Sequence, residues 1–253
     1  MNEYNKIIHG DCLEIMDKLI EKGVKVDAVI TDIPYGVITK TCEWDVVIPL
    51  DKMWERINKL SNDNTPIILF GKQPFTSKLN LSNIKDFRYE IIWEKDKGTD
   101  FGNANRKPIN AHENISVFYK KQPTYNRICD IGTPYVRKNK RTNGEDDTNF
   151  KSDNSGEWIN DGKRTPKTVR KYNRVSAGGN KPLHPTEKPI DLMKWLVESY
   201  SNENDLILDF TCGVGSTLCA CIETNRKYIG IEKDEHYCEM AINRVNGYIH
   251  ITE

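Results

Sequence analysis

Apolar and polar residues repeat along the chain with two different spacings, and each spacing predicts one kind of element. Apolar residues three or four apart predict helices over 12–22, 51–60, 189–200, 216–223 and 235–246. Short runs rich in β-branched residues and closed by turn residues predict strands over 26–31, 66–70, 88–93, 114–119, 205–209 and 227–232. A strand, a helix and a strand follow one another near the C-terminal end, as in a βαβ unit. We therefore predict an α/β fold with a largely parallel sheet.

The periodicity fades between Lys121 and Asn180, where Asn, Lys, Arg, Gly, Asp and Thr dominate. A structureless loop of this length is uncommon in a compact domain unless it has a function. We expect an inserted region that faces a partner. The predicted organisation has three parts, namely 1–120, the insert 121–183, and 184–253.

The 253 residues carry equal numbers of acidic and basic side chains, so the formal net charge is zero. This argues against a protein that coats nucleic acid without specificity. The charge is unevenly distributed, however: Tyr135–Pro189 holds thirteen Lys or Arg against seven Asp or Glu, a local excess of six. Such a stretch either contacts phosphates or is solvated surface, and charge alone leaves both readings open.

The seven cysteines form no CxxC pair and no even framework, which is typical of a reducing compartment. Cys212, Cys219 and Cys221 fall on one predicted turn and helix, and we interpret them as small buried thiols rather than metal ligands. No apolar run approaches the roughly 20 residues of a bilayer span. The first residues also lack the features of a signal peptide. We expect a cytoplasmic protein without a membrane segment and without a metal.

The segment Asp209–Thr217 follows a predicted strand and opens a predicted helix. Gly213 and Gly215 would let the backbone pass close to a ligand, in front of the unpaired N–H groups of a helix N-terminus. Glu232 ends the next strand, where an acid meets ribose hydroxyls in dinucleotide-type sites. A Gly-x-Gly alone is often a tight turn, but these surroundings favour a cofactor site.

A nicotinamide cofactor would favour a third glycine, and Leu218 stands at that position. The Asp209 carboxylate would repel a pyrophosphate, whereas it would attract a cationic ligand that carries an amino group. This favours S-adenosylmethionine as the cofactor.

Asp32-Ile33-Pro34-Tyr35 ends a predicted buried strand and offers the groups that amino methylation of a base requires. An exocyclic amino group is a poor nucleophile because its lone pair is delocalised into the ring. The Asp32 carboxylate and the Ile33 carbonyl could accept its two N–H bonds, while the Tyr35 ring stacks on the base. The tetrapeptide alone favours a plain strand-ending turn. Its place beside a cofactor-type turn favours the catalytic interpretation.

These segments resemble a known family. Asp32–Tyr35 resembles the Asp-Pro-Pro-Tyr motif of amino-group DNA methyltransferases, and Asp209–Thr217 resembles their Asp-Pro-Phe-x-Gly-x-Gly-Thr-Thr cofactor motif. Further blocks are similar to family segments: His9-Gly10-Asp11-Cys12, Trp93-Glu94-Lys95, Ala111-His112-Glu113-Asn114 and Thr186-Glu187-Lys188-Pro189. Their order resembles the permuted β-class, in which a variable middle region recognises the target sequence.

The resemblance implies a circularly permuted, seven-stranded, mostly parallel methyltransferase (Rossmann-like) sheet with an inserted target-recognition region. It also implies a flipped target base in double-stranded DNA and transfer to adenine N6 or cytosine N4. The residues expected to bind S-adenosylmethionine are Asp11, Cys12, Lys188, Asp209, Phe210, Gly213, Gly215 and Glu232. The residues expected to contact DNA are Lys138, Lys140, Arg141, Arg164, Lys167, Arg170 and Lys171.

Two departures from the motifs matter. Ile33 replaces the first proline, which keeps the carbonyl acceptor and loses some rigidity. Phe210-Thr211 replaces Pro-Phe, which changes the expected contact with the cofactor's adenine while keeping both glycines.

We expect adenine as the target because Asp heads the tetrapeptide, where cytosine-N4 enzymes more often have Ser. A cytosine-C5 enzyme is disfavoured because it needs a Pro-Cys nucleophile, and the chain has no Pro-Cys dipeptide. Methylation of cytosine N4, of RNA or of a protein glutamine remains an alternative, as does a silent DNA-binding protein of the same fold. The resemblance also leaves open a homodimer and a restriction endonuclease partner outside this chain.

Overall fold

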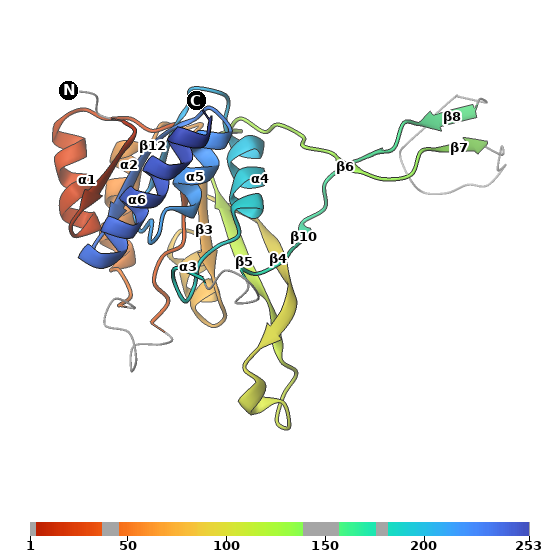
Figure 1. Ribbon diagram of the computed structural model, residues 1–253, viewed down its shortest axis with the longest axis horizontal. Helices are drawn as coiled ribbons and strands as arrows, with labels where there is room; N and C mark the ends of the chain where they lie inside the picture. The colour runs from red at the N-terminus through yellow and green to blue at the C-terminus, as the bar shows by residue number, and fades with distance from the viewer. Residues whose placement is uncertain (1–3, 37–45, 139–156, 176–181, 253) are drawn as a thin grey trace. The chain divides into compact units, whose positions relative to one another are not determined.

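The computed structural model describes residues 4–36, 46–138, 157–175 and 182–252. Its centre is an eight-stranded sheet in the order β1-β12-β11-β2-β3-β5-β4-β10 (Figure 1). Neighbouring strands run parallel, except that β5 is antiparallel to both β3 and β4. The strand bounds are β1 Lys6–His9, β2 Ala28–Thr31, β3 Ile67–Gly71, β4 Phe87–Thr99, β5 Asn110–Phe118, β10 Val169–Tyr172, β11 Leu206–Asp209 and β12 Lys227–Glu232.

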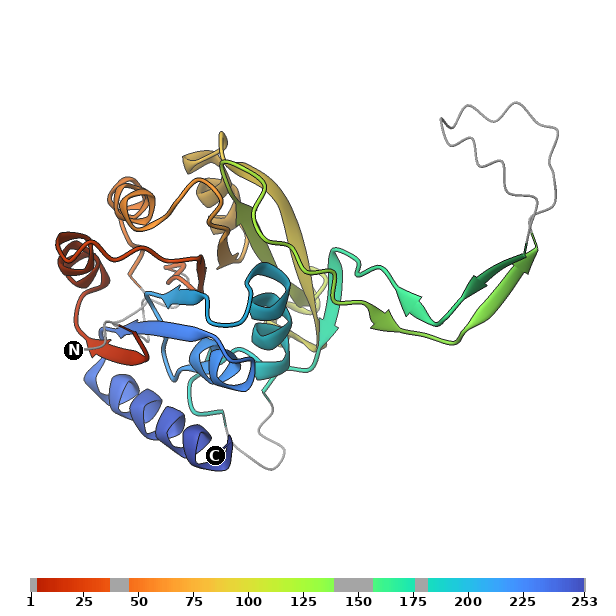
Figure 2. The same cartoon turned by 90° about the horizontal axis from the view of Figure 1, so that it is seen from above.

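Helices cover both faces of this sheet, as the view in Figure 2 shows. One face carries α1 Cys12–Glu21, α2 Leu50–Leu60 and α3 Phe75–Ser82. The other face carries α4 Ile190–Tyr200, α5 Ser216–Glu223 and α6 Glu235–Thr252. No helix within the described ranges is both long enough and apolar enough to cross a bilayer.

The predicted α/β fold is confirmed, and the sheet has one strand more than the seven implied by the resemblance. The additional strand is β10, which lies inside the predicted insert and pairs in parallel with β4. The sequence of this strand, Val-Arg-Lys-Tyr, is polar and only partly buried, so it has no apolar periodicity that could predict it. Backbone hydrogen bonds pair β10 with β4 instead, and the first of them runs from Ile92 N to the Thr168 carbonyl (2.7 Å).

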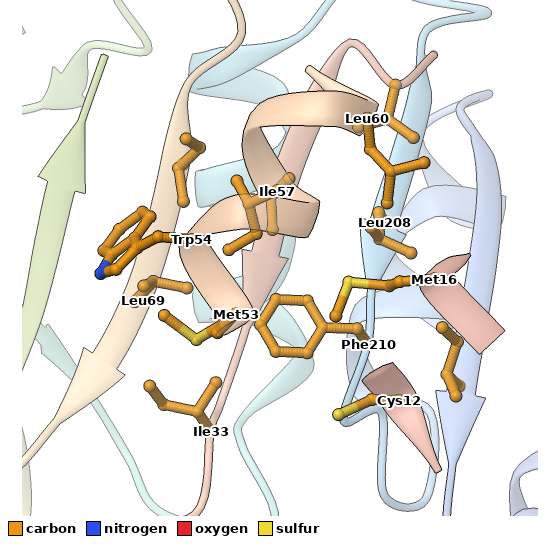
Figure 3. Close-up of a cluster of buried hydrophobic side chains, with 14 of the residues drawn as sticks. Cys12, Met16, Ile33, Met53, Trp54, Ile57, Leu60, Leu69, Leu208 and Phe210 are labelled. Atoms are coloured by element: carbon orange, nitrogen blue, oxygen red, sulfur yellow. The ribbon is translucent and has the colours of Figure 1, made fainter. Parts of the chain in front are cut away.

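The hydrophobic core visible in Figure 3 lies between the sheet and helices α1 and α2. All four residues of β2 are buried, as expected of a parallel strand that is covered on both faces. On α2, Met53, Trp54 and Ile57 face the sheet, and the Trp54 ring meets the edge of Phe118 at 4.9 Å between centroids. This core fixes the strands whose carboxyl ends carry the site.

Residues 127–167 form a compact unit of their own, separate from the unit that holds the sheet. Within this ribbon unit, β6 Asp130–Ile131 pairs with β9 Lys163–Arg164, and β7 Tyr135–Lys138 pairs with β8 Glu157–Asn160. Ribbons of two strands bury little apolar surface. Ile131, Val136 and Ile159 accordingly remain exposed. The ribbon unit lies within the predicted insert 121–183.

Candidate active site

The site lies where β11 and β2 run side by side and parallel. The chain leaves β11 towards α5 on one face of the sheet, and after β2 it reaches α2 on the other face. In open α/β sheets a crevice forms at such a switch point, outside the carboxyl ends of the strands. A pocket of about 540 Å³ opens here, and both Asp32 and Asp209 line it. Its size lies within the range of about 300–1,000 Å³ that is typical of small-molecule sites.

The glycine turn has a left-handed backbone, with φ of +52° at Gly213 and +79° at Gly215. Gly213 N donates a hydrogen bond to the Glu232 carboxylate (2.8 Å). A Cβ added to Gly213 would meet no atom within 4 Å, so this backbone faces open space. The turn therefore leaves room for a ligand in front of the N-terminus of α5.

Leu218, which stands where a nicotinamide motif has its third glycine, packs against β12. A Cβ on Gly230 would lie 2.6 Å from the Leu218 side chain. Close packing of α5 on β12 therefore depends on Gly230 of the strand, and no glycine is needed at position 218 of the helix. The helix thus lies close to the sheet although the chain lacks the third glycine of the dinucleotide-binding motif.

Asp209 is buried, and both of its carboxylate oxygens are engaged by the protein. The hydroxyls of Thr31 (2.7 Å) and Thr217 (2.5 Å) both donate to it. Burial raises the pKa of Asp209 to about 6, against the effect of these hydrogen bonds. We expected this carboxylate to hold a cationic cofactor, and its capacity for further hydrogen bonds is small.

A row of hydrogen bonds runs from Asp209 to the catalytic edge. The Thr31 and Thr211 hydroxyls lie 2.7 Å apart, and the Thr211 hydroxyl donates to the main-chain carbonyl of Asp32 (3.0 Å). The Thr31 hydroxyl donates to Asp209 and the Thr211 hydroxyl donates to the Asp32 carbonyl, so this pair of threonines joins the two strand ends.

The other predicted cofactor residues at this end have structural partners. Asp11 caps α1 by accepting from Leu13 N (3.0 Å), and it pairs with Lys233 (3.3 Å). Cys12 and Phe210 line the pocket, but both side chains belong to the buried core in Figure 3. Burial raises the pKa of the Cys12 thiol to about 12. A role for Cys12 or Phe210 in cofactor binding stays a prediction.

Cys212, Cys219 and Cys221 are buried free thiols. Burial raises the pKa of Cys219 to about 11 and that of Cys221 above its usual range. Both shifts hold these groups in the protonated form at neutral pH. The interpretation as small buried thiols is confirmed.

The Asp32–Tyr35 edge follows β2 and lines the pocket. The Tyr35 hydroxyl donates to Asp32 Oδ1, and the Lys188 ammonium donates to Asp32 Oδ2. The Ile33 side chain is buried in the core, and no donor within the described ranges reaches its carbonyl oxygen. The Tyr35 ring leans against Phe75 at 5.5 Å between centroids. The edge thus offers one carboxylate, one unpaired carbonyl and one ring to the same pocket.

Lys188 was predicted to bind the cofactor, and the structure places its amine on Asp32. A second carboxylate, Glu113 of β5, lies 3.5 Å from the same amine and is also bonded by Lys95 of β4. The sequence placed Lys95 and Glu113 only in blocks that resemble segments of the family. Their pairing depends on the tertiary fold, because 156 residues separate Lys188 from Asp32.

The residues predicted to contact DNA fall into three groups. Lys140 and Arg141 lie outside the described residues, as does the side chain of Lys138. Arg164 and Arg170 are engaged by aromatic rings: Arg164 stacks on Tyr135 at 4.8 Å, and Arg170 lies 4.6 Å from the centroid of Trp195. Lys167 is exposed, and Lys171 is paired at the surface with Glu94 (3.3 Å).

Comparison with known proteins identifies the family. The family of N6/N4 methyltransferases, described as DNA methylase, matches residues 26–243. Because this match covers most of the chain, the protein belongs to this family of DNA methyltransferases.

Individual relatives agree in sequence and in fold. Type II methyltransferase M.HpaI of Haemophilus parainfluenzae is 36% identical over 266 residues, which span 98% of this chain and 77% of that protein. The crystal structure of the M1.HpyAVI–SAM complex superposes with a TM-score of 0.66 at 25% identity, covering 95% of this chain and 98% of that one. The cytosine-N4-specific PvuII DNA methyltransferase has a TM-score of 0.64 at 13% identity over 97% of this chain and 91% of that one, a likeness in fold alone.

Proposed function

We propose that this protein methylates the N6 amino group of a flipped adenine in double-stranded DNA, with S-adenosylmethionine as methyl donor. The observation that carries the proposal is the pairing of two acceptors at one pocket edge. The Asp32 carboxylate and the Ile33 carbonyl lie side by side in sequence, beside the glycine turn of a cofactor site. An amino group with two N–H bonds requires this pair.

The charge and the size of the pocket support S-adenosylmethionine as its ligand. The open backbone at Gly213 and the carboxylates of Asp11, Asp209 and Glu232 line one end of it. Carboxylates accept from ribose hydroxyls and attract an ammonium or a sulfonium, whereas they would repel a pyrophosphate. When bound, S-adenosylmethionine supplies a methyl group on a positively charged sulfur.

The residues of the catalytic edge act on the amino nitrogen of the base. Asp32 and the Ile33 carbonyl each accept one N–H, which draws the nitrogen towards a tetrahedral form and turns its lone pair to the methyl carbon. Bound S-adenosylmethionine would supply the methyl carbon, and its sulfur would keep the electron pair of the C–S bond. The nitrogen then sheds one proton, and the Asp32 carboxylate, already its hydrogen-bond acceptor, is placed to take it.

Adenine is favoured because an aspartate heads the tetrapeptide. The second candidate is cytosine N4, since the cytosine-N4-specific PvuII enzyme has the same fold. The two bases present the same chemical group, and the described acceptors suit both.

Double-stranded DNA fits the edge of the sheet at which the pocket opens. Strand β4 runs parallel to β2, so the hairpin that joins β4 to β5 extends from the same edge. Its tip, with the short helix η1 Phe101–Asn103, exposes Lys97, Arg106 and Lys107. With Lys171, these side chains supply the positive charge that phosphate contacts need.

The experiment uses the purified full chain, S-adenosylmethionine labelled on its methyl group, and unmethylated duplex DNA. The DNA is digested to nucleosides, and label is expected in N6-methyldeoxyadenosine. Label in N4-methyldeoxycytidine would favour the second candidate. DNA binding without label would instead identify a silent DNA-binding protein, and parallel samples of RNA and protein substrate test the remaining alternatives.

A further inference from the structure

Four charged side chains of alternating sign stand in a row beside the pocket. Lys95 bonds to one oxygen of Glu113, and the other Glu113 oxygen lies 3.5 Å from Lys188. Lys188 in turn bonds to Asp32. The side chains are 11%, 13%, 6% and 20% exposed in that order, so water screens them weakly. Three of the four have no assigned role in methyl transfer to the base.

The Lys188 ammonium has three N–H donors, and three oxygens of the protein surround it. They belong to Asp32, to Glu113 and to the Thr186 carbonyl (3.1 Å). The face of Phe70 lies 5.2 Å from the nitrogen and closes another side. Hydrogen bonds to Asp32 and to the Thr186 carbonyl occupy two of the donors, and the third faces Glu113 at ion-pair distance, so a cofactor would have to compete with these oxygens.

The catalytic carboxylate depends on this amine for its charge. Burial raises the pKa of Asp32, and the Lys188 ammonium opposes the rise, while the negative charge of Glu113 adds to it. Burial would lower the pKa of Lys188, but its two carboxylate neighbours more than offset this, so the amine stays protonated. A protonated Asp32 would lose the acceptor that the amino group of the base requires.

We propose that Lys188, held by Glu113 and Lys95, is a positioning residue for Asp32, which it keeps ionised and fixes in orientation. The inference rests on the proposed function and changes the expected role of Lys188 from cofactor ligand to support of the catalytic edge. Each oxygen of a carboxylate can accept two hydrogen bonds. With Tyr35 on Oδ1 and Lys188 on Oδ2, one position on each oxygen remains for the amino group of the base.

The negative charge of Glu113 makes the net charge of the row zero. Two lysines and two carboxylates sum to zero, so loss of Lys188 alone leaves two carboxylates with one lysine. Loss of Lys188 together with Glu113 leaves Lys95 and Asp32, which again balance. The positioning role therefore predicts that the second substitution repairs part of the damage done by the first.

Other titratable groups around the row do not change this expectation. The Tyr35 hydroxyl faces Asp32, and His184 lies near Lys188. Burial lowers the pKa of His184 to about 4, and the charge of Lys188 adds to this effect, so the imidazole is neutral near pH 7. Asp209 feels the charge of Asp32 but keeps its own partners.

The test titrates the Asp32 carboxyl directly, in full-length protein without cofactor, by NMR of 13C-labelled aspartate. Its signal is assigned by its loss in Asp32→Asn. Lys188→Met should raise the pKa of Asp32 by about one unit or more. Glu113→Gln should lower it, and Lys188→Met/Glu113→Gln should return it towards the wild-type value. Lys233→Met removes a charge at the Asp11 end of the same pocket and serves as the matched control, with no shift expected at Asp32.

The rate of methyl transfer and the affinity for the cofactor distinguish a positioning role of Lys188 from a role as cofactor ligand. Under the proposal, Lys188→Met slows methyl transfer in the bound complex by about a hundredfold, with cofactor affinity nearly unchanged. A weakened cofactor affinity, together with an unshifted Asp32 titration, would overturn it and make Lys188 a cofactor ligand. If Lys188→Met does not fold, Glu113→Gln decides by the same titration, and an unshifted Asp32 in that variant contradicts the proposal. A wild-type protein that methylates no DNA would refute the proposed function while leaving the carboxyl titration interpretable.

Discussion

The Thr211 hydroxyl lies 3.0 Å from the main-chain carbonyl of Asp32, and it donates to that oxygen. Thr211 belongs to the glycine turn that follows β11, whereas Asp32 follows β2. One hydroxyl thus joins the cofactor side of the pocket to the catalytic side. Thr211 stands where the related motif has Phe, so this link accompanies the departure from the family pattern.

Thr211→Val should slow methyl transfer about five- to tenfold, with cofactor affinity little changed. The substitution keeps the shape and removes one neutral hydrogen bond, which is worth about 1 kcal/mol. Single-turnover rates at saturating cofactor measure the effect. Thr211→Ser retains the hydroxyl, so its rate should stay close to that of the wild type. Equal rates for all three proteins would show that this hydrogen bond does not contribute to methyl transfer.

Tyr35→Ala should slow transfer more than Tyr35→Phe, because the ring stacks on the base. The structure adds a role for the hydroxyl, which donates to Asp32 Oδ1. Tyr35→Phe should therefore also lose activity, by about tenfold for one hydrogen bond to a charged acceptor. The same single-turnover assay ranks the three proteins. Full activity of the Phe variant would confine the role of Tyr35 to stacking, and equal losses would argue against stacking.

Asp209→Asn should change how stability depends on pH. The folded pKa of about 6 lies above the ordinary aspartate value of 3.8, so the folded state binds this proton more tightly. The stability that this contributes is fully present below about pH 4 and is lost as pH rises through 6. The asparagine has no such loss. The free energy of unfolding of the variant relative to wild type should then rise by about 2 kcal/mol from pH 4 to pH 7. Urea unfolding across this range measures the difference, and parallel curves would contradict the raised pKa.

Lys167→Ala should weaken DNA binding uniformly across sequences and reduce its dependence on salt. Removing one lysine that neutralises a phosphate lowers the slope of log K against log salt by about 0.9. Lys85→Ala is the matched control, because Lys85 is exposed before β4 begins, at the end of that strand away from the pocket. Binding isotherms at several salt concentrations decide the point. An unchanged slope for Lys167→Ala would remove this residue from the DNA interface.

The sequence predicted most of the elements that carry the site because those elements have strong local patterns. Strands β2, β11 and β12 are short apolar runs, and each ends at the acid or turn that lines the pocket. Strands β6 to β10 are short and polar, and they form through backbone pairing with distant segments, so no periodicity marks them. Helix α3, Phe-Thr-Ser-Lys-Leu-Asn-Leu-Ser, buries only Phe75, Thr76 and Leu79, and this stripe is too short to mark a helix in the sequence.

The candidate site divides in the same way. The backbone demands of Gly213 and Gly215 are local, so the motif predicted them correctly. The partners of Lys188 are not local, because Asp32, Glu113 and Lys95 come from three other elements of the chain. In the sequence, a lysine next to a motif suggests a contact with a ligand. Only the fold shows that carboxylates of the protein already pair with Lys188.

Modified-base sequencing of DNA from cells that express this chain or its Asp32→Ala variant tests the proposed reaction most directly. The wild-type protein should give N6-methyladenine at one recurring sequence and the variant none, while the purified variant still binds S-adenosylmethionine. Adenine methylation that persists in the variant would contradict the acceptor role of Asp32. Modification at cytosine, or none with the wild-type protein, would contradict the proposed reaction.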